Sequence, residues 1–248
     1  MPAYNEEKRI GNTLQLYLDY FERKLSKDFE IYVVVNNTKD DTVAVVEKFM
    51  KRHKQLNYGD IKERIGKGGA VIYGLKHVKG DYIGFVDADA STPPEAFYDL
   101  YEKINNYDGI VASRWIKGAK VSPKQTFTRR VASRGFNLIV RVLFGLNIRD
   151  TQCGAKLFTK KAAKNVVDDL GITKWAFDVD LLYLLKKKGY NVIEIPTTWH
   201  DQAGSKLNVK RVSFEMFLAI IRLRLVYSPF SFVVNVYNYL GDVIHGRR

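Results

Sequence analysis

Two aspartates separated by one residue, Asp87 and Asp89, are the side chains of this chain best suited to chemistry. They follow the apolar run 82–86 and precede the turn-like segment 91–94. Such a run is typical of a buried strand, and the carboxyl ends of strands in an open α/β sheet border the crevice that binds ligands. Two carboxylates there repel each other unless a cation neutralises them, and oxygen ligands suit Mg²⁺ or Mn²⁺ shared with substrate phosphates. The alternative is a solvated acidic turn.

A glycine-rich segment precedes these aspartates in the chain. Gly66, Gly68 and Gly69 lie at the start of a predicted helix, where they let a ligand approach the backbone closely. Lys67 adds a cation that suits a phosphate group. The alternative is a turn that binds nothing.

The elements that must position these residues alternate between strands and helices. The hydrophobic pattern predicts an amphipathic helix over 6–24, with Ile10, Leu14 and Phe21 on its apolar stripe. Strands over 30–35, 82–87 and 109–112 alternate with helices over 40–52, 68–78 and 94–104, which predicts a mostly parallel, Rossmann-like sheet with helices on both faces. Beyond residue 114 we expect a helix over 129–144, a strand over 156–158, helices over 160–168 and 177–188, and a strand over 191–195.

Composition limits the classes of protein that this chain can belong to. Its 248 residues, 46% of them hydrophobic, are enough for one large α/β domain. The net charge of +13 suits nucleic acid, an anionic membrane or a phosphorylated substrate. No nucleic-acid partner is predicted, because no helix-turn-helix, zinc-finger or ribonucleoprotein signature is visible. The single cysteine, Cys153, allows no intramolecular disulfide and fits a reducing compartment.

Residues 208–248 are predicted to form an appendage to this domain. They contain six basic and two acidic residues, and the stretch 225–240 has no charge and five Tyr or Phe residues. Sixteen uncharged residues broken by Pro229 fall short of the about 20 that span a bilayer. Basic residues beside an aromatic-rich apolar stretch predict amphipathic helices that lie in the interface of an anionic membrane. A core helix or an oligomer contact is the alternative, and the oligomeric state stays open.

Seven short motifs follow one another in a recognisable order. They are Pro2-Ala3-Tyr4-Asn5-Glu6, Gly66-Lys67-Gly68-Gly69-Ala70, Asp87-Ala88-Asp89, Ser113-Arg114, Asp150-Thr151-Gln152-Cys153-Gly154, Trp175-Ala176-Phe177-Asp178 and Gly204-Ser205-Lys206-Leu207. This series resembles glycosyltransferase family 2, and within it the dolichyl-phosphate hexose synthases, especially the glucosyl type. The resemblance covers nearly the whole chain. It implies a GT-A fold over residues 1–207, a nucleotide-diphosphate sugar donor, Mg²⁺ or Mn²⁺, and a dolichyl or polyprenyl phosphate acceptor.

The resemblance also implies roles for individual residues. Those at the nucleotide sugar are Pro2, Ala3, Tyr4, Glu6, Asn36, Lys67 and Asp87. Asp87 and Asp89 hold the metal, which stabilises the charge that gathers on the departing nucleoside diphosphate. Asp89, Asp178 and Gln152 act at the reacting groups. The acceptor phosphate is bound by Arg114, Arg129, Ser133 and Lys206, with Arg130 as an equal candidate for the Arg129 role, because Arg and Lys suit phosphate.

The sequence departs from the family pattern in three places. Where the family has Asp-Asp-Gly-Ser after its second strand, this chain has Val35-Asn36-Asn37-Thr38, so the nucleobase preference is open. Ser91 stands where mannosyl relatives often have Gln, which favours the glucosyl branch. Family members also carry an apolar strand ahead of the first motif. That strand would lie in the middle of the sheet, so we expect a natural start upstream of Met1 and a gap in the core of this form.

These observations predict an inverting glycosyltransferase that moves a hexose to dolichyl or polyprenyl phosphate, with UDP-glucose favoured and GDP-mannose as the alternative donor. We expect it to lie peripherally on the cytoplasmic face of a membrane. The acceptor phosphate is already largely ionised near neutral pH, so Asp178 or Asp180 need only orient the acceptor or accept a residual proton. For Asp178, a charge that favours the amino end of a helix is the alternative. Two other functions stay open: a family-2 enzyme acting on a sugar hydroxyl, and a non-catalytic binder of nucleotide or membrane.

Overall fold

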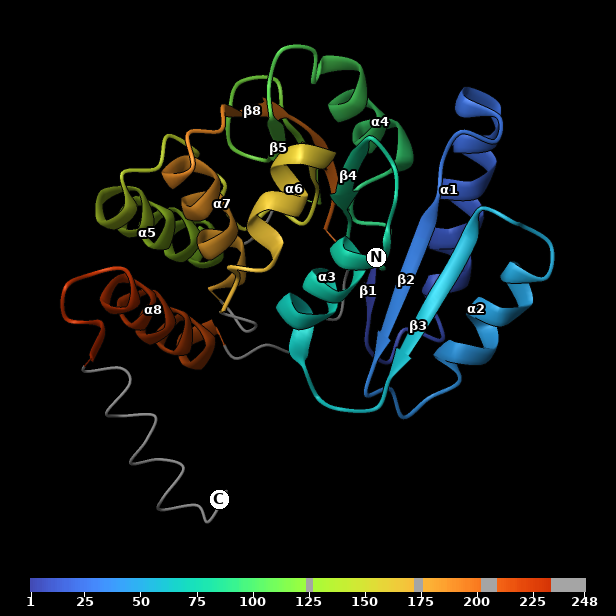
Figure 1. Cartoon of the computed structure of the whole chain (residues 1–248), viewed down its shortest axis with the longest axis horizontal. Coiled ribbons are helices and arrows are strands. Elements are labelled where there is room, and N and C mark those ends of the chain that lie inside the picture. The colour runs from blue at the N-terminus through green and yellow to red at the C-terminus, as the bar shows by residue number, and fades with distance from the viewer. Residues whose placement is uncertain (124–126, 172–175, 202–208, 233–248) are drawn as a thin grey trace.

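A parallel sheet with the strand order β1-β2-β3 is formed by the first part of the chain (Figure 1). The structure is a computed structural model that describes residues 1–123, 127–171, 176–201 and 209–232. The elements of this part are β1 (Pro2–Ala3), α1 (Ile10–Leu25), β2 (Ile31–Asn36), α2 (Thr42–Met50), β3 (Leu56–Ile61) and α3 (Gly66–His77). Pro2 lies opposite Val34 and Ile31 opposite Leu56, so all three strands run in one direction.

A second sheet follows with the strand order β4-β7-β5-β8. Its elements are β4 (Tyr82–Phe85), α4 (Pro94–Lys103), β5 (Gly109–Ser113), β7 (Lys156–Thr159), α6 (Lys160–Val167), α7 (Phe177–Lys187) and β8 (Val192–Pro196). β7 is antiparallel to both of its neighbours, whereas β5 and β8 are parallel. The predicted α/β architecture with mostly parallel pairing is confirmed, but the expectation of one sheet is wrong, because the described strands of the two halves do not pair with each other.

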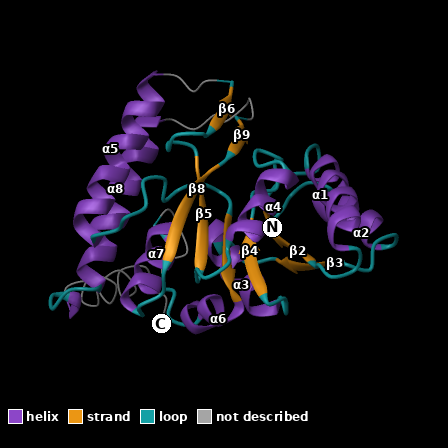
Figure 2. Ribbon diagram, turned by 90° about the horizontal axis from the view of Figure 1, so that it is seen from above, coloured by secondary structure: helices purple, strands orange, loops and turns teal. Residues whose placement is uncertain are grey.

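The remaining elements lie on the flank of the second sheet. β6 (Lys120–Ser122) pairs in parallel with β9 (Thr198–His200). α5 (Phe127–Phe144) and α8 (Val209–Val226) lie side by side, as Figures 1 and 2 show.

α5 and α8 are held together by an apolar contact. Val140 and Phe144 of α5 belong to the same buried cluster as Ile220 and Leu223 of α8. α8 lies at the start of the predicted appendage, and residues 233–248 lie outside the described residues. Within the described ranges, no helix combines the length and the apolar character needed to cross a bilayer.

Four short or polar strands were not predicted from the sequence: β1, β3, β6 and β9. In β3, Gly59 and Asp60 interrupt the apolar pattern, and only Leu56 is buried. β6 and β9 have three residues each, too few for a pattern to emerge. These strands lie outside the buried runs from which the other strands were recognised.

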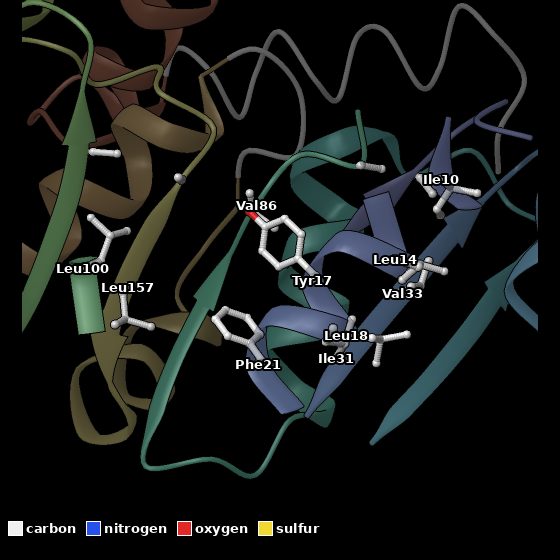
Figure 3. Packing of buried hydrophobic residues seen from close by; sticks show 14 of the residues in the cluster. Ile10, Leu14, Tyr17, Leu18, Phe21, Ile31, Val33, Val86, Leu100 and Leu157 are labelled. Atoms are coloured by element: carbon white, nitrogen blue, oxygen red, sulfur yellow. The ribbon is translucent and has the colours of Figure 1, made fainter. Parts of the chain in front are cut away.

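The core of the first half rests on the apolar stripe of α1. Leu14 and Leu18 pack toward Ile31 and Val33 of β2, while Tyr17 and its neighbour Phe21 point toward the β4 side (Figure 3). The ring centroids of Tyr17 and Phe21 are 5.6 Å apart in an edge-to-face arrangement. The predicted amphipathic stripe is therefore confirmed.

A cavity of about 550 Å³ lies between β2 and β4. Its lining includes Tyr32 of β2, Gly84 of β4, and side chains from α1, α3 and α4 such as Phe21, Val71 and Phe97. Contacts between helix side chains, rather than backbone pairing of β2 with β4, join the two halves here.

Candidate active site

The loop after β4, which carries the two aspartates, is held from behind by α1. The Thr13 hydroxyl donates to the Ala88 carbonyl at 2.8 Å, and the Tyr17 phenol donates to the Thr92 carbonyl at 2.8 Å. Both donors are fully buried. Because a helix is rigid, these hydrogen bonds fix the backbone on either side of Asp89.

Two carboxylates and two cations meet at this loop. Lys67 Nζ lies 2.5 Å from Asp87 Oδ1, and Arg9 Nη1 lies 4.0 Å from Asp89 Oδ2. The backbone N–H of Ser91 donates to Asp89 Oδ1 at 3.0 Å. Partial desolvation of the half-exposed Lys67 side chain lowers its pKa, but the attraction of Asp87 and nearby carboxylates outweighs this effect and raises that pKa above its usual value. The sequence predicted Lys67, Asp87 and Asp89 at one site, and the structure brings them together.

Gly154 forms a wall against the Asp87 carboxylate. A β-carbon added at Gly154 would lie 2.1 Å from Asp87 Oδ2 and 2.6 Å from Asp87 Cγ, far inside van der Waals contact. Glycine is therefore the residue that lets the turn approach this carboxylate so closely.

Asp178 lies in the first turn of α7 and is buried. Its Oδ1 accepts a hydrogen bond from Lys156 Nζ at 2.5 Å, and the same ammonium group donates to the Cys153 carbonyl at 2.7 Å. Asp178 also contributes to the raised pKa of Lys67, so it acts electrostatically on the cation that is paired with Asp87. The predicted reacting-group residue Asp178 thus belongs to the same cluster of charges.

The neighbouring acid Asp180 is directed to another partner. Its Oδ1 accepts a hydrogen bond from the phenol of Tyr227, just beyond α8, at 2.6 Å. Burial and this hydrogen bond raise the pKa of Tyr227. The first turn of α7 is therefore tied to β7 through Asp178 and to the end of α8 through Asp180.

The residues predicted to contact the nucleotide differ in whether their side chains are exposed and unpaired. Pro2 and Ala3 form β1 and place Tyr4 at its end, where this residue is 56% exposed. Glu6 accepts two hydrogen bonds from Arg9, at 2.8 and 2.7 Å. Tyr4 is thus open to a ligand, whereas the Glu6 carboxylate already has a partner.

The Asn36 side chain makes hydrogen bonds within the protein. Its Nδ2 donates to the Glu63 carbonyl at 2.6 Å, and its Oδ1 accepts from the Gly66 N–H at 3.0 Å. The side chain is 5% exposed. Asn36 therefore fixes the loop that leads into α3, and this loop carries Lys67 to the site.

Arg114, predicted at the acceptor phosphate, makes a buried ion pair. Its Nε and Nη2 donate to the two carboxylate oxygens of Asp150, each at 2.8 Å. The guanidinium carbon lies 4.9 Å from the centroid of the Trp199 ring. Asp150 is fully buried. The third guanidinium nitrogen of Arg114, Nη1, makes no hydrogen bond to this carboxylate.

We expect Arg114→Ala to destabilise the fold by about 3–5 kcal/mol, because it leaves the Asp150 carboxylate buried and unpaired. Urea unfolding followed by circular dichroism measures the change. Lys103→Ala is the control, because both side chains of its pair with Asp99 are exposed and such a pair is worth about 1 kcal/mol or less. A loss for Arg114→Ala no larger than that of the control contradicts this expectation.

The other predicted residues are placed as follows. Ser133 is half-buried on α5, and its carbonyl accepts from Asn137 Nδ2 at 3.1 Å. The Arg129 side chain and all of Lys206 lie outside the described residues. Gln152 Nε2 is buried and has no hydrogen-bond partner among the described residues.

The two aspartates fit a hard divalent cation. Carboxylate oxygens are preferred ligands of Mg²⁺ and Mn²⁺. In the described part of the chain, no three His, Cys, Asp or Glu residues gather closely enough to hold a metal by themselves. Asp87 and Asp89 would thus supply two ligands, with the others from water and phosphate, as is usual for Mg²⁺.

Sequence reasoning missed several residues that build the site. Arg9 lies three residues beyond Glu6, which ends the first motif. That motif was interpreted only for its contacts with the nucleotide. Thr13 and Tyr17 were assigned to a helix without a role at the loop. Lys156 was placed on a strand but not in the site. Only the i,i+3 spacing of Arg9 and Glu6 was a signal available in the sequence.

Solved glycosyltransferase structures share this fold. Glucosyl-3-phosphoglycerate synthase from Mycobacterium tuberculosis in complex with uridine diphosphate matches with a TM-score of 0.64 at 14% identity, over 90% of this chain and 76% of that chain. A mannosyltransferase from Pyrobaculum calidifontis in complex with GDP-mannose and Mn²⁺ matches with a TM-score of 0.59 at 16% identity, over 92% and 63%. The fold is therefore GT-A, that of a class of glycosyltransferases.

Sequence comparison defines the family. The family model described as glycosyl transferase family 2 matches residues 1–167. Dolichyl-phosphate beta-glucosyltransferase of Dictyostelium discoideum is 34% identical over 239 residues, which are 92% of this chain and 73% of the relative. Its counterpart from Homo sapiens is 33% identical over 225 residues, 84% and 68% of the two chains. This chain belongs to glycosyl transferase family 2.

Proposed function

We propose that this chain transfers glucose from UDP-glucose to dolichyl or polyprenyl phosphate, with inversion at the anomeric carbon. The observation that carries the proposal is the group of Asp87, Asp89 and Lys67 beyond β4, where a nucleotide diphosphate and a metal suit the charges. Relatives over most of the chain are named dolichyl-phosphate beta-glucosyltransferases, which supports the acceptor and the sugar.

The proposed reaction needs little proton transfer. An acceptor phosphate oxygen attacks the anomeric carbon while the bond from this carbon to the diphosphate oxygen breaks, and the diphosphate leaves with the bonding electrons. The attacking oxygen is already ionised near neutral pH, so Asp178 orients the acceptor or takes a residual proton. When held by Asp87 and Asp89, Mg²⁺ or Mn²⁺ would supply Lewis-acid stabilisation of the leaving group.

Side chains around the aspartates suit the two substrates. Tyr4 offers an exposed ring to the nucleobase, and the unpartnered Gln152 amide suits the donor sugar or diphosphate. For the acceptor phosphate we propose Arg114 through Nη1, together with Ser133 and the predicted residues Arg129 and Lys206. Cationic side chains there offset the charge of a phosphate that must approach two carboxylates.

The donor and acceptor are tested together by measuring release of nucleoside diphosphate from UDP-glucose and GDP-mannose. Each donor is offered with dolichyl phosphate or with soluble sugars. We expect release only from UDP-glucose with dolichyl phosphate. Equal release with soluble sugars would favour a family-2 enzyme acting on a sugar hydroxyl. Nucleotide binding without release in any combination would favour a non-catalytic binder.

We also propose that α5, α8 and residues 208–248 contact an anionic membrane on its cytoplasmic face. α5 exposes Val131, Leu138 and Val142 at helical spacing, and α8 exposes Phe214 and Phe217. Arg130 and Arg141 directly precede Val131 and Val142, and Arg134 lies four residues before Leu138, so basic side chains border the apolar stripe. An apolar stripe beside basic side chains favours a helix surface that lies in the membrane interface.

Replacing Val142 and Phe217 together with serine should weaken binding to anionic liposomes about tenfold or more, because two exposed apolar anchors are lost. Flotation at low and high salt measures the binding, and salt should weaken it because basic side chains contribute. Leu16→Ser, at an exposed position of α1, is the control. If the double variant floats as well as the control, this face contacts another protein surface instead.

A further inference from the structure

A fully buried lysine, Lys156, has no part in the reaction described above. Its side chain is 0% exposed, and its ammonium group lies 5.2 Å from the centroid of the Phe85 ring. Its hydrogen-bond partners are the Asp178 carboxylate at 2.5 Å and the Cys153 carbonyl at 2.7 Å. Lysine is almost never fully buried unless it is paired, so this arrangement needs a reason.

Stability alone is a weak reason for this ion pair. The free-energy cost of removing two charges from water offsets most of their attraction. An apolar pair of similar volume often stabilises a fold equally well. The surroundings are apolar: Phe85, Phe158 and Phe177 belong to one buried cluster. The groups that the Lys156 ammonium holds in place offer a better reason.

The Lys156 ammonium connects two segments that border the site. Asp178 is in the first turn of α7, whereas Cys153 precedes Gly154, the residue packed against the Asp87 carboxylate. One side chain thus sets the position of Asp178 relative to the turn that supports Asp87. Lys67 differs, because its side chain is 49% exposed and can change partner when a ligand enters.

The charge of Lys156 also matters for a phosphate acceptor. A buried carboxylate repels an approaching phosphate, and the repulsion is stronger where water is excluded. The adjacent ammonium offsets the Asp178 charge without reaching solvent itself. The pair presents a fixed hydrogen-bond acceptor with little net charge.

We propose that Lys156 is a positioning residue for the transfer: it holds Asp178 beside the Asp87 turn and offsets its charge, so that a phosphate monoester can approach. This inference rests on the proposed function. It adds a residue that acts through Asp178 and touches neither substrate.

The test compares Lys156→Met and Lys156→Arg with wild type, using UDP-glucose and dolichyl phosphate. We expect Lys156→Met to lower kcat about 100-fold or more, while the Kd for UDP-glucose changes less than about threefold. The kcat of Lys156→Arg should be at least tenfold higher than that of Lys156→Met, because arginine restores the charge. Phe158→Leu, in the same strand and the same cluster, is the control for a general loss of core packing.

The double variant Lys156→Met/Asp178→Asn guards against a variant that fails to fold, because it removes both charges. We expect it to regain the wild-type melting temperature but to stay as slow as Asp178→Asn. Wild-type kcat in the double variant, or a loss in Lys156→Met no larger than in Phe158→Leu, would overturn the inference alone. A wild-type protein that transfers nothing to dolichyl phosphate would overturn the proposed function, and the inference with it.

Discussion

Replacing Asp89 with asparagine should lower turnover at least about 100-fold, which corresponds to a barrier about 2.7 kcal/mol higher. The amide keeps the volume of the side chain and an oxygen that can still accept from the Ser91 N–H. It removes the negative charge that suits a divalent cation at the end of β4. Steady-state rates of UDP release, measured across a range of Mg²⁺ and Mn²⁺ concentrations, give the size of the loss.

Asp99→Asn on α4 is the matched control, because this carboxylate is exposed and paired only loosely with Lys103 at 3.9 Å. Its rate should equal that of wild type. EDTA should abolish the wild-type rate, and Mg²⁺ or Mn²⁺ should restore it. A rate that EDTA leaves unchanged would show that Asp87 and Asp89 have a different role from metal binding.

Gly154→Ala should lower turnover by a similar factor of about 100, although Gly154 has no side chain to contribute. The new β-carbon would lie 2.1 Å from Asp87 Oδ2, so either the carboxylate or the turn must move. Both movements displace a proposed metal ligand, and a shift of about 1 Å in a catalytic group can cost about 100-fold in rate. The Mn²⁺ concentration at half-maximal rate should rise along with the fall in turnover.

Gly171→Ala is the control, because a β-carbon at Gly171 would meet no atom of the described residues within 4 Å, its chain neighbours aside. Its melting temperature and rate should stay near those of wild type. If Gly154→Ala binds Mn²⁺ and turns over as wild type does, the Asp87 carboxylate tolerates the movement and its observed position is not required for catalysis.

The pair of aspartates at the end of β4 was predictable because its residues are close together in the sequence. Asp87 and Asp89 follow an apolar run that predicts a buried strand. The carboxyl ends of strands in an α/β sheet border a ligand-binding crevice in many different proteins, so the position of these residues did not depend on the rest of the chain. The helices were also predictable, because their apolar stripes recur at helical spacing. The α/β architecture followed from the alternation of these two signals.

The long-range ion pairs were not predictable, because each depends on which elements become neighbours. Asp150 lies 36 residues beyond Arg114, and Asp178 lies 22 residues beyond Lys156. A lysine in an apolar strand reads as an exposed position until its partner helix is placed. The role of Asn36 was not predictable for the same reason. Its hydrogen bonds to Glu63 and Gly66 depend on the position of the loop before α3.

The separation of the two sheets has a consequence for cooperativity. Because β2 and β4 do not pair, β1, β2 and β3 form one hydrogen-bonded unit and β4, β7, β5 and β8 form another, apart from the β6–β9 pair. The coupling between these two units depends on side chains such as Tyr17 and Phe97. Regions with fewer shared contacts open separately in native-state hydrogen exchange. Amides of the β1–β3 unit should thus exchange through an opening that leaves β5, β7 and β8 protected. A ligand that touches Lys67 on one unit and Asp89 on the other would make the two units open as one.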